Sequence, residues 1–507
     1  MSAEPAVLLI NPTITQARSA RFPLAIMSIA AALPERFQAT LIDGNVDRDF
    51  IGTATRAVSR GCVRAVGISV MGGPQLPTAI AVSKAIRAAA PGVAIVWGGH
   101  FPTICPDAAL NTAYVDYAIR SQGEDTFAEL MEALTDEATE ARLALIPGLT
   151  RRRQGEAVHN ANRPFSAGSL ARPLDLSRLP DPRRYLSRTF LGERTAGYQA
   201  ALGCRFRCTF CGVAAMFRGK TALPAAERLD HDLGLLRSTL GANAIQFYDH
   251  NFFDREVEMV PLLEVLAKHA LPWWCFARSD ALVNMSDAAW ALVRRSGLRM
   301  TYIGAETPSD RLLHDFRKGT HSDQTLAAVE KCRTHGVIPE LSFMLAPPHA
   351  PEEETERTFE FIREVKRVHP STEIMLYVYT PLPAHPGLQA GPAAAARGTL
   401  ALRDSEGAPV IFPATADEWA QPRWRDYWCH TDAPWLTERL RARIRDFSTV
   451  LGCRFPTITD IRSPRIGKAA VRALAAWRYR FRRYDRPWEL DLSRRVIRLW
   501  DPRVTSL

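Results

Sequence analysis

Residues 203–212 read GCRFRCTFCG and follow directly after a predicted strand. They place Cys204, Cys208 and Cys211 within eight residues, with the spacing C-x3-C-x2-C. Thiolates are the usual ligands of iron–sulfur clusters, and three of them on one loop can hold three irons of a cubane. No further cysteine occurs until Cys275, so the fourth iron would lack a cysteine and stay open to a substrate group. The alternatives are a three-cysteine zinc site without an evident fourth ligand, or buried thiols.

The chain around this loop is long enough for about three domains, at roughly 150 residues per domain. Apolar residues make up 47% of its 507 residues and charged residues 23%, which excludes disorder, collagen and coiled coil as the overall class. The longest nearly continuous apolar stretch, residues 22–33, is too short to cross a bilayer, and the N-terminus lacks the basic segment of a signal peptide. Nine cysteines are too sparse for a disulfide scaffold. Because three of them lie within eight residues, we expect a metal site in a reducing compartment and therefore a cytoplasmic protein.

Residues 6–130 alternate short apolar runs with helical segments. The predicted strands are 6–11, 39–43, 65–70, 93–97 and 117–120, and the predicted helices are 23–33, 51–60, 77–89 and 126–134. Because these strands lack a polar face, we expect an α/β fold with a parallel sheet covered on both sides, doubly wound and Rossmann-like. Ligands of such folds bind beyond the carboxyl ends of the strands. The predicted boundaries are a domain over 1–145 and a hairpin with a proline-rich linker over 146–190.

A second alternating region spans residues 191–390. Its predicted strands are 196–201, 244–248, 273–277, 300–304, 340–344 and 374–379, and its helices are 225–240, 256–269, 287–296, 322–335 and 352–368. Six strand–helix repeats favour a partial (β/α)6 barrel. An Ala/Gly/Pro-rich linker is predicted at 387–398, before a mostly helical, Trp/Arg-rich C-terminal region over 391–507.

With an aromatic residue before its last cysteine, the C-x3-C-x2-C loop at the start of a strand–helix repeat resembles the radical S-adenosylmethionine (SAM) superfamily. The resemblance implies a [4Fe-4S] cluster on Cys204, Cys208 and Cys211, whose open iron is chelated by the amino and carboxylate groups of SAM. It also implies an external one-electron reductant of the flavodoxin or ferredoxin type. Reductive cleavage of SAM would yield a 5′-deoxyadenosyl radical, which can remove hydrogen from an unactivated carbon.

The same resemblance implies a set of SAM-binding residues. They are Phe210, Gly212, Asp249, Arg278, Gly304 and Glu306. Glu306 belongs to a G-x-E segment whose carboxylate meets the ribose hydroxyls, and the glycine before it allows close backbone approach. Asp249 and Arg278 end the second and third barrel strands, where they would handle the SAM amino group and carboxylate. The alternative for each residue alone is an ordinary polar strand end.

Three loops of the first region, at 22–25, 98–103 and 123–127, resemble the cobalamin-binding domain fused upstream of many radical SAM enzymes. The expected cobalamin contacts are Ser69, Met71, Gly72, Gly98, Gly99, His100, Pro102, Thr103, Gly123 and Glu124. No G-x-G-x-x-G follows the first strand, which disfavours a dinucleotide. The Asp-x-His-x-x-Gly motif that ligates cobalt in many such domains is absent. We therefore expect cobalt without a protein base or with a nearby loop ligand, and His100 as a corrin or solvent contact more than an axial ligand.

The leading functional hypothesis is a cobalamin-dependent radical SAM methyltransferase that acts on an unactivated carbon of a small or lipophilic substrate. The second is a cobalamin-dependent oxidation, cyclisation or rearrangement without methyl transfer, as in the anaerobic tetrapyrrole cyclases. An RNA-binding or RNA-modifying protein is the third, and nucleic acid is disfavoured because Lys and Arg are not spread over the barrel. No catalytic residue beyond the cluster ligands is predicted.

The basic charge is concentrated at the end of the chain. Residues 462–507 hold 13 Lys/Arg and 4 Asp/Glu, and residues 469–483 favour a helix. Arginine beside tryptophan and tyrosine is typical of an interface between water and lipid headgroups, which predicts peripheral contact with an anionic membrane surface. The alternative is a basic helix that packs on the barrel through its aromatic residues. The six remaining cysteines are predicted to be lone buried thiols, and the alternative is that Cys429 and the adjacent His430 form part of a second cluster with Cys453.

Overall fold

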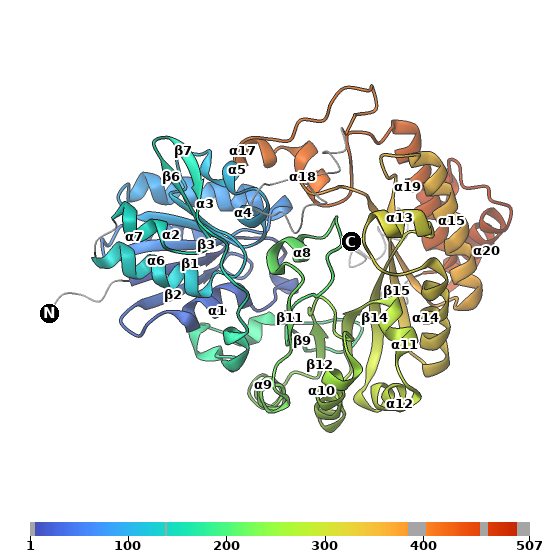
Figure 1. The fold of residues 1–507 in the computed structure, drawn as a ribbon. Coiled ribbons are helices and arrows are strands. Elements are labelled where there is room, and N and C mark those ends of the chain that lie inside the picture. The colour runs from blue at the N-terminus through green and yellow to red at the C-terminus, as the bar shows by residue number, and fades with distance from the viewer. Residues whose placement is uncertain (1–5, 137–138, 384–401, 457–464, 494–507) are drawn as a thin grey trace.

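The computed structural model describes residues 6–136, 139–383, 402–456 and 465–493 (Figure 1). The linker predicted at 387–398 lies outside these ranges. Two parallel-rich sheets, each covered by helices, stand side by side, and the C-terminal helices pack against both of them. Within the described ranges, no helix combines the length and apolar character that crossing a membrane would require.

The first sheet has the strand order β2-β1-β3-β4-β5-β6-β7. Its strands are β1 (Ala6–Asn11), β2 (Gln38–Asp43), β3 (Val63–Ser69), β4 (Ala94–Gly98), β5 (Tyr117–Ile119), β6 (Leu149–Arg153) and β7 (Glu156–His159). β1 to β5 run parallel, so their carboxyl ends share one edge, and the chain switches direction across the sheet between β1 and β3. The predicted hairpin forms β6 and β7, and it extends this sheet because β6 pairs antiparallel with the free edge of β5.

Both faces of the first sheet are buried, as the doubly wound prediction requires. Its helices are α1 (Leu24–Ala32), α2 (Phe50–Val58), α3 (Leu76–Ala89), α4 (His100–Ile104), α5 (Pro106–Leu110), α6 (Glu124–Asp136) and α7 (Glu140–Ala144). Side chains of a strand alternate between its faces. In β1, Leu8 and Ile10 therefore join the core under α2 and α3, while Val7 and Leu9 join the core under α1 and α6.

The second sheet has the strand order β16-β15-β14-β13-β12-β9-β8 and is parallel except for β8. Its strands are β8 (Leu186–Ser187), β9 (Thr195–Tyr198), β12 (Ala244–Phe247), β13 (Trp273–Ala277), β14 (Leu298–Glu306), β15 (Ile338–Leu345) and β16 (Glu373–Val378). All six strands predicted for this region are present. Their sequential order and the helices on the outer side confirm the partial barrel (Figure 1).

Helices alternate with these strands and bury a continuous core between themselves and the sheet. They are α8 (Gly212–Phe217), α9 (Ala226–Leu240), α10 (Glu256–His269), α11 (Ser279–Asn284), α12 (Asp287–Ser296), α13 (Asp310–Asp315), α14 (Ser322–His335) and α15 (Pro351–Val368). A short antiparallel pair, β10 (Leu202–Gly203) and β11 (Thr221–Ala222), frames the cysteine loop.

The C-terminal region divides into two parts with different neighbours. α17 (Ala416–Trp419) and α18 (Pro422–Trp428) pack on the first domain, where Asp417 pairs with Lys84 at 2.6 Å and accepts a 2.8 Å hydrogen bond from Tyr114. α19 (Glu438–Arg454) and α20 (Arg465–Arg480) pack on α15, and Phe447 stacks on Phe359 with ring centroids 3.7 Å apart. The first part therefore contributes to the space between the two sheets, and the second part covers the outside of the barrel.

A cavity between the two domains and the cysteine loop

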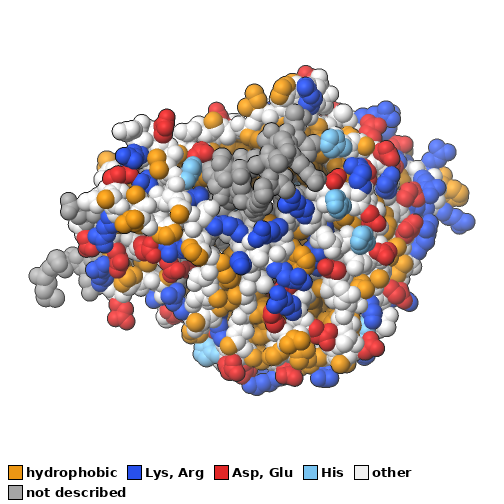
Figure 2. Space-filling view, in the orientation of Figure 1, with side chains coloured by type: hydrophobic (Ala, Val, Ile, Leu, Met, Phe, Trp, Pro, Cys, Tyr) orange, Lys and Arg blue, Asp and Glu red, His pale blue; other side chains and the backbone are white. Residues whose placement is uncertain are grey.

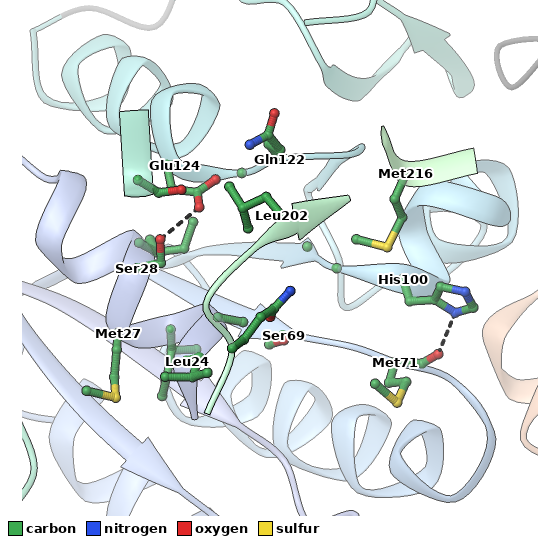
Figure 3. A pocket seen from close by; sticks show the side chains of 18 of the residues that line it. Leu24, Met27, Ser28, Ser69, Met71, His100, Gln122, Glu124, Leu202 and Met216 are labelled. Carbon is green, nitrogen blue, oxygen red and sulfur yellow. Dashed lines mark hydrogen bonds between the residues drawn. The ribbon is translucent and has the colours of Figure 1, made fainter. Parts of the chain in front are cut away.

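A cavity of about 760 Å³ lies between the carboxyl edge of the first sheet and the cysteine loop (Figure 3). Four parts of the chain line it: α1 and loops of the first domain, the linker at 169–175, residues near the start of the barrel, and the end of α18 with the two residues after it. Figure 3 shows Leu202 and Met216 of the barrel region facing Ser69 and His100 of the first domain. The cavity also reaches Leu9 in the middle of the sheet, beneath α1. Leu202 and Val213, which flank the cysteine loop, belong to its wall, but none of the three cysteines and none of the predicted SAM-binding residues lines it. A deep apolar arm extends inside the first domain.

Most of the predicted cobalamin-binding residues line this cavity. They are Ser69, Met71, Gly72, Gly98, Gly99, His100, Gly123 and Glu124. Pro102 and Thr103 do not line it: both are buried in α4, where the Thr103 hydroxyl accepts a 2.8 Å hydrogen bond from Ser121 N–H and bonds the Gly99 carbonyl at 2.6 Å. Thr103 thus connects the loop after β4 with the loop after β5 by hydrogen bonds, without itself lining the cavity. Sequence reasoning missed Ser28, whose hydroxyl donates to Glu124 Oε1 at 2.8 Å at the cavity wall.

Gly98, the last residue of β4, and Gly99 line the cavity without side chains. Gly99 has φ +100°, and a Cβ there would lie 3.1 Å from the Val70 carbonyl oxygen, so a side chain would strain the loop. A Cβ on Gly98 would instead meet only the Cβ of Ile119, at 3.9 Å, and would project into open space. The absence of side chains here suits a large planar ligand such as a corrin ring.

His100 connects the first domain to the cysteine loop. Its Nδ1 lies 3.2 Å from the Met71 carbonyl oxygen, which can only accept, so Nδ1 carries the proton and Nε2 does not. Burial lowers the pKa of His100 to about 4, and the ring is neutral at pH 7. A Cβ on Gly212 would overlap Nε2 of His100. Gly212, predicted to contact SAM, therefore also leaves the room that the histidine occupies, and Trp428 packs edge-on at 5.5 Å from the imidazole.

This contact predicts a strong coupling between positions 212 and 100. Gly212→Ala should displace the imidazole into the cavity and weaken cobalamin binding by about tenfold, because the ring and the new methyl group cannot share one space. His100→Ala in the same chain should restore most of the affinity, with a coupling energy on the order of 1 to 3 kcal/mol. Absorbance titration of the four proteins with cobalamin measures this cycle. Additive effects of the two substitutions would contradict the contact.

The cysteine loop brings its three sulfurs together. Cys208 is buried and Cys204 and Cys211 are half-buried. Burial, with smaller contributions from the neighbouring Cys208 and Cys204, raises the pKa of the Cys211 thiol to about 11, and these contributions report the proximity of the three thiols. Metal binding has to deprotonate such thiols. In the described ranges, no group of three His, Cys, Asp or Glu side chains is arranged so that it could hold a single metal ion. A cubane spreads three thiolates over three irons, and this sulfur-only donor set fits a [4Fe-4S] cluster.

Two contacts hold the loop against the barrel. Thr209 N–H donates to the Phe316 carbonyl at 2.9 Å, and the Arg278 guanidinium lies 3.5 Å from the ring centroid of Phe206. Arg278 also donates to Asp280 at 3.0 and 3.1 Å and to the Lys318 carbonyl at 2.6 Å. Its predicted role with the SAM carboxylate stays a prediction, because in this conformation its donors serve the protein itself.

Asp249 is the buried polar group of this region that most needs a partner. It lies two residues after β12 with no solvent exposure, and its Oδ1 accepts from the Ala201 N–H close to the cysteine loop. Its Oδ2 has no hydrogen-bond partner among the described residues, and burial raises the pKa of the carboxyl to about 7. Buried carboxylate oxygens are rarely left unpaired. An ammonium group of a ligand would satisfy this atom, as the SAM prediction requires.

Glu306 has a partner that the sequence did not indicate. Its Oε1 accepts from Lys318 Nζ at 2.6 Å, and both side chains are more than nine-tenths buried. Burial alone would lower the pKa of Lys318, but attraction to Glu306 and Cys208 outweighs it and raises the pKa. A Cβ on Gly304 would overlap Glu306 Oε1 and lie 2.8 Å from Lys318 Nζ, which explains the glycine. The ammonium also lies 5.9 Å from the ring centroid of Phe210.

Four more residues line the cavity although they were not predicted there from the sequence. They are His250, Trp428, Cys429 and His430. Burial lowers the pKa of His250 to about 4, and it follows Asp249 directly. Cys429 was predicted to be a lone buried thiol, but it is half-buried and lines the cavity. The same prediction is wrong for Cys62, which is exposed, and for Cys453, which is half-buried. The adjacent Cys429 and His430 were the only sequence signal for this part of the wall.

Comparison with known proteins matches two family models to separate parts of the chain. Residues 11–131 match the B12 binding domain, and residues 198–362 match the radical SAM superfamily. Among curated proteins, the uncharacterized methyltransferase PH0819 of Pyrococcus horikoshii is 23% identical over 346 residues, 68% of this chain and 73% of that protein. The anaerobic magnesium-protoporphyrin IX monomethyl ester cyclase of Synechocystis is 23% identical over 325 residues, 62% of this chain and 63% of the cyclase.

Two solved structures share the fold of most of the chain. The radical SAM methyltransferase TsrM from Kitasatospora setae has a TM-score of 0.64 at 16% identity and covers 94% of this chain and 98% of its own. The cobalamin-dependent radical SAM enzyme OxsB has a TM-score of 0.55 at 18% identity and covers 70% of this chain and 52% of its own. The cofactors of this architecture are cobalamin, SAM and a [4Fe-4S] cluster. With a B12-binding domain followed by a radical SAM domain, the chain belongs to the cobalamin-dependent radical SAM enzymes.

Proposed function

We propose that this enzyme transfers a methyl group to an unactivated carbon of a small or lipophilic substrate in the cytoplasm. The observation that carries the proposal is the shared cavity, in which His100 of the cobalamin domain touches the cysteine loop at Gly212. When bound, the cluster would supply reductive cleavage of SAM and the cobalamin would supply a transferable methyl group. The two relatives named as methyltransferases, PH0819 and TsrM, support this reaction.

The chain's own residues would bind, orient and exclude water. Asp249 offers its unpaired oxygen to the SAM ammonium, and the Glu306–Lys318 pair offers a carboxylate and an ammonium to the ribose side. Apolar side chains from both domains, such as Met216 and Leu24, line the cavity and keep water from a reactive radical.

Cyclisation without methyl transfer is the second candidate, since one relative is named as an anaerobic tetrapyrrole ester cyclase. The two reactions differ in what becomes of SAM. A radical methylation consumes two SAM per product, one as methyl donor and one as radical source, so it should release S-adenosylhomocysteine and 5′-deoxyadenosine in equal amounts. A cyclisation should release 5′-deoxyadenosine alone.

The test uses anaerobically reconstituted enzyme with cobalamin, a chemical reductant and SAM whose methyl group carries deuterium. Equal release of the two SAM products, with the label in a product enlarged by one CH2 unit, supports methylation. Release of 5′-deoxyadenosine without S-adenosylhomocysteine or label transfer contradicts methylation and favours cyclisation.

We also propose that α20 and the segment after it contact an anionic membrane surface. The inner side of this region packs on the barrel through Ala475, Tyr484 and Leu490, so the alternative of a basic helix packed on the barrel describes this side. Its outer side exposes large apolar side chains. They are Leu474, Trp477, Phe481, Trp488 and Leu492. Exposed arginines such as Arg480 and Arg483 flank them. Aromatic rings with flanking cations suit the headgroup region, and each cation near an anionic surface contributes on the order of 1 kcal/mol.

Liposome flotation tests the membrane proposal. The wild-type enzyme should float with phosphatidylglycerol vesicles at low salt, and the triple variant Trp477→Ser, Phe481→Ser and Trp488→Ser should lose most of this binding, because the exposed rings are removed. A matched control replaces Leu145 and Val257, which are 80% and 86% exposed elsewhere on the molecule, with serine and should float like wild type. Wild-type protein that does not partition at low salt would contradict the proposal.

A further inference from the structure

The cysteine loop carries its own surface cations. Arg205 and Arg207 lie between two of the predicted cluster ligands, and both are exposed while Cys208 is buried. The loop thus turns its sulfur inward and its positive charge outward. Figure 2 shows Lys and Arg side chains gathered near the middle of the visible face.

Two further exposed cations, Lys220 and Arg317, lie next to this loop. Arg207 packs against the turn before Lys220, since a Cβ on Gly219 would lie 2.6 Å from Arg207 Nε. The hydrogen bond from Thr209 N–H to the Phe316 carbonyl, at 2.9 Å, brings the exposed Arg317 beside the loop. We call the four residues Arg205, Arg207, Lys220 and Arg317 the basic rim.

Among the residues that the structure describes, most of the charge on the basic rim has no ion-pair partner. Arg205 forms an ion pair with Asp254 at 2.6 Å, and the side chain of Asp254 is only 5% exposed. Within the described ranges, no carboxylate forms an ion pair with Arg207, Lys220 or Arg317. Elsewhere on the barrel, exposed cations commonly pair with a helix neighbour, as Arg333 does with Glu330. The basic rim therefore attracts an external anion more strongly than an ordinary mixed surface does.

We infer that the basic rim is the docking surface for a small acidic one-electron carrier protein of the flavodoxin type. This inference rests on the radical SAM chemistry of the proposed function, which needs an electron at the cluster. Electron transfer weakens steeply with distance, so the donor has to dock close to the cysteine loop, and Cys204 is only half-buried there. The carrier is oxidised by one electron and the cluster is reduced by one, and no bond forms or breaks in this step.

The size and shape of the basic rim favour a protein carrier over RNA. Phosphates recur along a nucleic-acid strand, and RNA binding needs cations along that track. The four residues of the basic rim instead surround a single loop. Electron-transfer complexes are small and transient, and complementary charge chiefly speeds their association.

The test measures how fast a bacterial flavodoxin, fully reduced, reduces the cluster of the complete, cobalamin-loaded enzyme in a stopped-flow spectrometer. The variant Arg207→Glu, Lys220→Glu and Arg317→Glu leaves the internally paired Arg205 in place. Its rate should fall by at least about tenfold at low salt, and the wild-type rate should fall as salt is added. The matched control Arg60→Glu, Arg295→Glu and Arg299→Glu carries the same charge change at remote exposed positions and should keep the wild-type rate at equal salt.

Dithionite separates docking from chemistry. The rim variant should retain its iron and be reduced by dithionite within about twofold of the wild-type rate, because a small reductant does not need the docking surface. Reduction of the rim variant by flavodoxin at the wild-type rate would overturn the inference. So would a wild-type rate that does not depend on salt. Retention of a structured RNA by the wild type, lost in the rim variant without a change in the flavodoxin rate, would assign the basic rim to RNA instead. Failure of dithionite-reduced wild type to cleave SAM would reject the proposed function separately.

Discussion

Replacing Cys204, Cys208 and Cys211 together with alanine is expected to abolish iron binding and the formation of 5′-deoxyadenosine. The three thiols share one loop and lie close enough to shift each other's pKa, so each would bind a different iron of one cluster. Without them no other part of the loop offers a soft ligand. Iron analysis, the visible absorption of the reconstituted protein and product analysis with SAM and dithionite measure the loss.

A second set of cysteines provides the control for this experiment. Cys62, Cys105 and Cys453 do not line the cavity, and their replacement with alanine removes the same number of thiols. This control should keep its iron and its SAM cleavage. Circular dichroism should show the same helix content in both variants, because the cysteine loop contributes little to either core. A variant without the three loop cysteines that still cleaves SAM reductively would refute the cluster assignment.

Gly98→Phe is expected to abolish cobalamin binding without unfolding the protein. The backbone at Gly98 does not require a glycine, and a Cβ there meets only Ile119, at 3.9 Å. The phenyl ring would therefore occupy the cavity and exclude a large planar ligand. We expect the affinity for cobalamin to fall on the order of 100-fold or more, because ring and ligand would clash directly. Absorbance titration with hydroxocobalamin measures the affinity.

The control for this substitution is Gly92→Phe. A Cβ on Gly92 meets nothing within 4 Å, and Gly92 does not line the cavity, so the same residue change is made outside the site. The control should bind cobalamin like wild type, and both variants should keep the wild-type melting temperature within a few degrees. Tight cobalamin binding by folded Gly98→Phe would show that the cavity is not the corrin site.

Much of the architecture could be predicted because it depends on local patterns. Strand β13 and helices α10 and α12 begin and end where hydrophobic runs, caps and proline or glycine breaks place them. The carboxyl edge of the first sheet was predictable as well, since parallel strands necessarily align their ends. The cysteine spacing, a property of one loop, likewise indicated the cluster.

Contacts between distant segments could not be predicted in the same way. The pairing of β6 with β5 depends on which sheet edge is left free after folding. The partner of Glu306 is Lys318, on a loop after α13 that carries no motif, and Trp428 reaches the cavity from more than 300 residues beyond His100. Arg278 directly follows β13, close to where it was expected, yet its Nε and Nη2 donate to neighbouring protein groups.

The sequence by itself determined the two domain classes, and it predicted the three cluster ligands and the edge of the sheet where cobalamin would bind, because short-range spacing and hydrophobic periodicity encode these features. Only the tertiary structure decided how the two sites face each other. It placed His100 against Gly212, left Asp249 Oδ2 buried without a partner, and turned the cations of the cysteine loop outward. These features depend on the packing of segments far apart in the chain, and no local pattern specifies which side chains will share one buried space.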